Sequence, residues 1–164
     1  MKSSAGLNST PRDKVRALRI VSISMIAGVA LFSTVIFFVN RSALPPLAAD
    51  AASYRMEILA VLLAAGLLAV FFSRKRWGKK MQQARDSAGG LDEKLDIYRM
   101  ALMNYMSLTE VPAFFAVIAF FLTGQAVFLL AALLPLIFMG AKLIAIKKLP
   151  EELQLSWQEG ELLK

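Results

Sequence analysis

The sequence has no cysteine and no histidine among its 164 residues. Their absence excludes disulfide bonds, thiolate nucleophiles, Cys/His zinc sites, histidine-ligated haem and histidine acid–base catalysis. Phosphate-binding loops, dinucleotide fingerprints, metalloprotease helices and serine elbows are also missing from the sequence. We therefore expect no catalytic residue, no metal site and no cofactor, and a protein that is not an enzyme.

Apolar residues, by contrast, are abundant and gathered in long runs. Hydrophobic residues make up 57% of the chain, above the roughly 45–50% apolar content of soluble domains. A soluble fold of this size could not cover that much apolar surface, and about 20 apolar residues suffice to cross a bilayer as a helix. We predict an all-α protein with four transmembrane helices arranged as two antiparallel helical hairpins. The expected spans are Ile20–Val39, Met56–Phe72, Ala101–Thr123 and Ala126–Ile146.

The net charge of +7 is unevenly distributed along the chain. Five Lys or Arg residues precede the first span, eight lie between the second and third, and four lie at or after the end of the fourth. Two lie between the first and second spans, and none between the third and fourth. This positive-inside pattern predicts cytoplasmic N and C termini. Because it accounts for the basic excess, we expect attraction to anionic lipid headgroups and no nucleic-acid binding.

The segments outside the spans complete the expected domain organisation. Residues 1–19 are polar and basic, which predicts a flexible cytoplasmic arm ahead of a membrane domain over residues 20–148. The first apolar run is longer than a signal-peptide core, so we expect an uncleaved signal-anchor. Residues 149–164 form a cytoplasmic tail, in which Leu149, Leu153 and Trp157 recur at helical spacing after Pro150. We predict a short amphipathic helix there, with a frayed tail as the alternative.

The segment between the second and third spans, residues 73–91, is predicted to be a cytoplasmic loop with a hinge at Gly89-Gly90. It opens with a basic cluster around a tryptophan, a pattern typical of the membrane interface. Contact with lipid headgroups is the simplest interpretation, and specific binding of one anionic lipid or of an acidic partner is the alternative. The residues concerned are Arg74, Lys75, Arg76, Trp77, Lys79 and Lys80.

A single long helix is expected over residues 91–123. Leu91, Leu95, Tyr98 and Leu102 follow a helical spacing that leads into the third span without a break. Gly124-Gln125 is so short a connection that the third and fourth spans must form an antiparallel hairpin.

An acidic side chain, Glu110, lies within the third span, where a charge is costly. If the hairpin folds at Gly124-Gln125, Lys142 lies about 4.5 Å away in depth, counted at 1.5 Å per residue. Glu110 is then a candidate for an ion pair with Lys142, for a protonatable pathway residue, or for contact with another subunit. The candidate ion or proton site comprises Glu110, Lys142, Ser107, Thr109 and Tyr105.

Two further patterns concern how the spans pack. Ala60/Ala64 and Ala65/Ala69 place small residues at helical spacing on the second span, which favours close helix contacts, although alanine is also simply common. A shift of 82 residues aligns residues 28–38 with 110–120 at five identities in eleven, a weak internal repeat of the hairpin.

The stretch Thr109–Gly124, TEVPAFFAVIAFFLTG, resembles the acid-bearing helix of the rotary ATPase proteolipid (c-type) subunits. That resemblance implies proton or cation translocation through Glu110 in a homo-oligomer. As a whole the chain resembles bacterial four-span membrane proteins, which implies a fold and a bacterial inner (plasma) membrane location, but no activity. We predict a non-enzymatic accessory or scaffolding component of a membrane complex, in contact with other membrane subunits or with itself. Ion translocation is the alternative.

Overall fold

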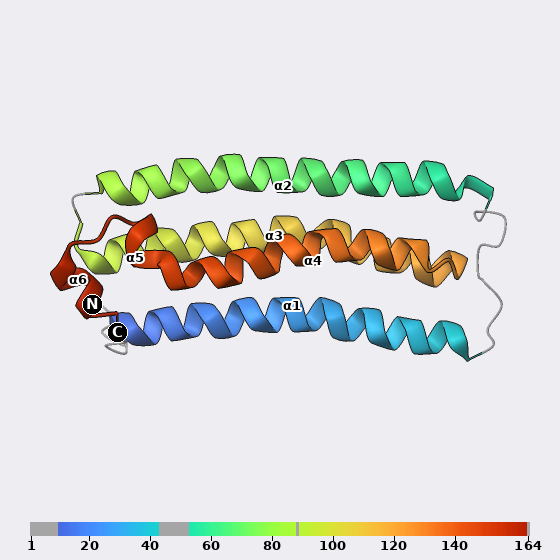
Figure 1. Cartoon of the computed structure of the whole chain (residues 1–164), viewed down its shortest axis with the longest axis horizontal. Helices are drawn as coiled ribbons and strands as arrows, with labels where there is room; N and C mark the ends of the chain where they lie inside the picture. Colours follow the sequence, from blue (N-terminus) through green and yellow to red (C-terminus); the bar gives the residue numbers. More distant parts are fainter. Residues whose placement is uncertain (1–9, 43–52, 88, 164) are drawn as a thin grey trace, which may run out of the picture.

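The computed structural model describes residues 10–42, 53–87 and 89–163, and these residues form helices, turns and no strand. Four long helices make an antiparallel bundle (Figure 1). Each is long and apolar enough to cross a membrane. The predicted all-α four-helix fold is therefore confirmed, and the four long apolar helices support a small multi-pass integral membrane protein. The helices are α1 (Pro11–Arg41), α2 (Arg55–Asp86), α3 (Leu91–Thr123) and α4 (Val127–Ala145).

The helices α3 and α4 lie in the middle of the bundle, with α1 and α2 on opposite flanks (Figure 1). The turn between α3 and α4 is tight because Gly124 adopts a left-handed conformation, with φ of 69°, and donates its N–H to the Phe120 carbonyl at 2.8 Å. A glycine takes this conformation without steric cost. The expected α3–α4 hairpin is therefore confirmed.

The start of α1, the end of α2 and the start of α3 meet at one end of the bundle, here called the terminal end (Figure 1). Three short elements fold back over it: η2 (Ile146–Lys148), α5 (Leu149–Glu152) and α6 (Trp157–Glu161). The larger of two apolar core clusters lies there and joins α1, α2, α3 and α4 to the tail. Its fully buried side chains include Leu95, Tyr98, Leu102, Met139 and Leu153.

Two helices extend well beyond the apolar spans expected from the sequence. Helix α1 begins at Pro11, where Thr10 and Asp13 form a reciprocal capping box, so the prediction of a flexible arm is wrong for residues 11–19. Residues 1–9 lie outside the described residues. Helix α2 runs on to Asp86, so most of the expected loop over residues 73–91 is helical. This part of α2 packs against the bundle, because Ser73, Met81 and Ala84 are buried at helical spacing along one face of the helix.

The boundaries of α3, Leu91–Thr123, are those predicted. The tail differs from its prediction, because the chain turns at Gln154, whose φ is 51°, and divides the expected single helix into α5 and α6. Leu149 and Leu153 are buried as an amphipathic helix requires, whereas Trp157 is 80% exposed. Ser156 starts α6 with its own capping box to Glu159. Those hydrogen bonds to Ser156 hold the pKa of Glu159 below its usual value.

The helices α1 and α3 run in the same direction along the bundle (Figure 1). Lys14 pairs with Asp96 at 3.7 Å, and the rings of Phe32 and Phe114 lie 5.4 Å apart. Both pairs are separated by 82 residues in the sequence, the offset of the weak internal repeat. A residue of α1 therefore lies at the same depth as the residue of α3 that follows it by 82.

Candidate functional site

The five residues of the candidate ion or proton site do not form one cluster. Tyr105, Thr109 and Lys142 lie together on the side of α2. The Thr109 hydroxyl donates to the Tyr105 carbonyl at 2.8 Å and lies 3.5 Å from the Ser73 hydroxyl. Glu110 is half-buried and Ser107 is exposed on another part of α3. The sequence placed all five at similar depth, but depth does not fix the direction in which each side chain points.

The Lys142 ammonium lies in a cage of aromatic rings and one carboxylate. It is 3.6 Å from the centre of the Trp77 ring and 5.8 Å from that of Tyr105. Its ion pair is with Glu152 on α5, at 3.5 Å. The Lys142 and Glu152 side chains are only 17% and 25% exposed, and Tyr98 packs edge-on against Trp77 at 5.1 Å. A cation over aromatic faces is attracted by their negative quadrupole, and most strongly where water is excluded.

The predicted ion pair between Glu110 and Lys142 is wrong. The tail folds back over the terminal end and brings Glu152 to the Lys142 ammonium. Glu110 shares a helix face with Phe114, which contacts Phe32 of α1. Its carboxylate therefore faces the seam between α1 and α3, whereas Lys142 faces α2. Among the described residues, Glu110 forms no ion pair.

The residue of α1 at the depth of Glu110 is a glycine. The offset of 82 residues between α1 and α3 places Gly28 at the depth of Glu110. A Cβ atom built on Gly28 would meet nothing within 4 Å. Gly28 is exposed, so the surface of α1 is open at this depth.

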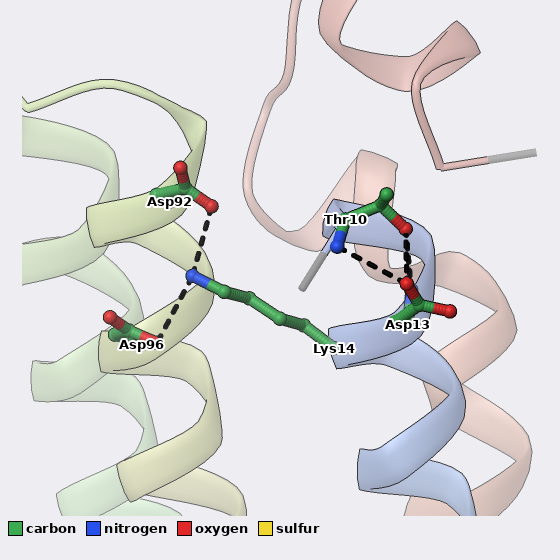
Figure 2. A network of polar contacts seen from close by, with 5 residues as sticks. All are labelled: Thr10, Asp13, Lys14, Asp92 and Asp96. Atoms are coloured by element: carbon green, nitrogen blue, oxygen red, sulfur yellow. Dashed lines mark hydrogen bonds and ion pairs between the residues drawn. The ribbon is translucent and has the colours of Figure 1, made fainter. Parts of the chain in front are cut away.

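A second polar site joins the start of α1 to the start of α3. Figure 2 shows the Lys14 ammonium between two carboxylates, 2.9 Å from Asp92 and 3.7 Å from Asp96. The hydrogen bond to Asp92 raises the pKa of Lys14 above its usual value. These carboxylates hold a lysine, and in the described part of the chain no three Asp or Glu side chains are placed to bind a metal ion.

The predicted headgroup residues divide into two sets on α2. Arg76, Trp77, Lys79 and Lys80 line a cavity of about 330 Å³, here called the basic cavity. Its other walls are Ser73 and four residues of α3, Ala101, Asn104, Tyr105 and Leu108. Arg74 and Lys75 are exposed and do not line it. Headgroup contact stays a prediction for all six residues, but only four of them line the basic cavity.

Sequence reasoning missed Glu152 as the partner of Lys142 and Tyr98 as a ring that packs against Trp77 of the cage. The Tyr98 hydroxyl lies close to the Glu152 carboxylate, and Tyr98 is fully buried. Arg85 at the end of α2 donates its Nε–H to the Glu152 carbonyl at 2.8 Å, which fixes α5 in place. The available signal was the acidic pair after Pro150. That signal does not identify Lys142 as the partner of Glu152, because the two residues come together only through the chain reversal at the terminal end.

Comparisons with protein-family models, with curated proteins and with solved structures give no match for this chain.

Proposed function

We propose that the protein is a non-enzymatic component of a larger membrane assembly, in which it contacts other subunits, or further copies of itself, through the exposed face of α1. The observation that carries this proposal is the thin packing of α1. Only 11% of the most apolar 18-residue stretch of α1 is buried inside the bundle, compared with 44% for the corresponding stretch of α3. The exposed side of α1 includes Ser24 and Gly28, one helical turn apart. Small and hydroxyl side chains at this spacing let membrane helices approach closely.

The proposal is tested by blocking the exposed face of α1. Gly28→Leu adds a side chain where a Cβ meets nothing, so the fold of the single chain should be preserved. We expect the protein to migrate on native gels in mild detergent within a larger complex, and this variant to lose at least half of that complex. The control is Ala64→Leu, an equally exposed position on the opposite flank, α2. Migration of the unmodified protein as a lone monomer, with nothing co-purifying, would contradict the proposal.

A second candidate function is proton or cation translocation through Glu110. The observation that favours it is the ion pair between Lys142 and Glu152, since it leaves Glu110 without that lysine as a counter-charge. A carboxylate inside a membrane is costly unless it is protonated, paired or beside water. Gly28, at the depth of Glu110 on α1, has open space around it, which leaves room for a proton or cation to approach the bundle at this depth.

For this second candidate, Glu110→Gln is expected to abolish ion flux in proteoliposomes while the protein still folds. Glu110 should also react with a carbodiimide, which modifies protonated carboxyls, more strongly at low pH. The matched control is Glu57→Gln, which removes an exposed carboxylate at the first turn of α2. Unchanged flux in the Glu110 variant would rule out translocation by this residue.

A further inference from the structure

We propose that the cleft between α2 and α3 binds one anionic phospholipid of the surrounding bilayer. The phosphate lies in the basic cavity, and one acyl chain lies along the neighbouring apolar groove. This inference concerns a ligand and goes beyond the proposed function, on which it does not depend.

The polar half of the site is the basic cavity. Arg76, Lys79 and Lys80 supply three cations from one side, and none of the described residues that line the cavity is acidic. Lys80 is half-buried and donates a hydrogen bond to the neutral side chain of Gln83 at 2.9 Å, so its charge is not cancelled there. Asn104 and Ser73 add uncharged polar groups to the walls. This set of donors suits a phosphate group, which accepts several charge-assisted hydrogen bonds.

The apolar half is a groove of about 520 Å³ between the same two helices. Ala65 and Ala69 of α2 make it deep, because their side chains are small, while Phe115 and Val111 of α3 form the opposite wall. Where the helices meet, a Cβ on Gly66 would lie 3.9 Å from the Pro112 Cβ, so the backbones approach closely. Apart from Thr123, every residue lining the groove is apolar.

The basic cavity and the apolar groove are continuous. Leu108 lines both. On α2, the groove residues Ala65 and Ala69 lead at helical spacing to the cavity residues Arg76 and Lys80, along one face of the helix. A molecule with an anionic head and an apolar chain therefore fits the whole cleft, whereas a soluble anion fills only its polar half.

The groove is long enough to hold an acyl chain through one leaflet of a bilayer. Half of a hydrocarbon core of about 30 Å is about 15 Å, or roughly ten residues of helix. Along α3 the groove extends 15 residues from Leu108 to Thr123, which is about 22 Å at 1.5 Å per residue. The groove thus begins beside the cavity and continues through the depth that an acyl chain of that leaflet occupies. Trp77, between Arg76 and Lys79, lies at the level of the headgroup, where tryptophan is enriched in membrane proteins.

The first test removes charge inside and outside the cavity. The protein is purified in mild detergent with equal amounts of phosphatidylglycerol and phosphatidylcholine, and bound lipid is counted by native mass spectrometry. We expect one phosphatidylglycerol per chain to be retained. The double variant R76Q/K80Q should weaken its binding about 100-fold, since each charge-assisted hydrogen bond to the phosphate contributes a factor of about ten. The control R74Q/K75Q removes the same charge from exposed positions outside the cavity, and binding should stay close to that of the unmodified protein.

The second test fills the groove without changing the charge. Ala69→Phe should displace the bound lipid, while Ala64→Phe, on the exposed opposite side of α2, should not. Equal losses in R76Q/K80Q and R74Q/K75Q would show only diffuse attraction to the surface and overturn the proposal. It would also fail if inorganic phosphate displaced the lipid completely, or if a second copy of the chain occupied the groove.

Discussion

Replacing Glu152 by alanine is expected to lower the free energy of unfolding by about 3 kcal/mol, the low end of the range for breaking a buried ion pair. The low end applies because the Lys142 and Glu152 side chains keep 17% and 25% of their exposure. The variant leaves Lys142 among aromatic rings without its carboxylate. The hydrogen bond from the Arg85 side chain to the Glu152 backbone carbonyl is unaffected, so the loss of stability measures the contribution of the Glu152 side chain. The measurement is denaturant unfolding in mixed micelles.

Two further variants isolate the ion pair. Glu151→Ala removes an exposed carboxylate next to Glu152 and should change stability by less than about 0.5 kcal/mol. The double variant Lys142→Met/Glu152→Ala should recover much of the loss, because no unpaired charge then remains in the cage. If the double variant is as unstable as the sum of its single variants, the two residues are not coupled and the role given to the pair is mistaken.

The four helices and the α3–α4 hairpin were predictable because their signals are local. Apolar runs of membrane-spanning length define the spans, and Gly124 supplies the left-handed turn residue that a short connection needs. The helix ends were less predictable, because the spans were delimited by hydropathy and a helix can continue into water. Thr10 and Asp13 cap α1 well before its apolar run begins. Good helix formers extend α2 to Asp86 beyond its apolar run.

The candidate site was only partly predictable, for a geometric reason. Counting residues from a hairpin turn gives the depth of a side chain, but not its direction around the helix. Depth alone placed Lys142 beside Glu110, whereas the two side chains face different neighbours. The residue that meets Lys142, Glu152, lies in a tail whose reversal depends on tertiary packing of Leu149 and Leu153. Long-range contacts of this kind leave no periodic pattern in the sequence.

Replacing Leu102 by alanine is expected to cost about 2 kcal/mol of unfolding free energy, the low end of the range for a buried leucine. Leu102 on α3 is fully buried in the core cluster at the terminal end, so truncation leaves a cavity. The low end is expected because an apolar side chain gains little free energy when it moves from lipid into the protein core. Most of the lost stability therefore comes from lost packing contacts. Denaturant unfolding in mixed micelles again gives the value.

Met100, two residues away on the same helix, is the matched control because it is 52% exposed. Met100→Ala should change the free energy of unfolding by less than about 0.5 kcal/mol in the isolated protein, as expected for a surface position. If instead it costs as much as Leu102→Ala, the exposed face of α3 is covered under the conditions of measurement. The protein would then be present as part of a larger assembly that covers this face, and not as a single chain with only detergent around it. Comparing the two variants therefore also tests whether the described helices form a complete folding unit.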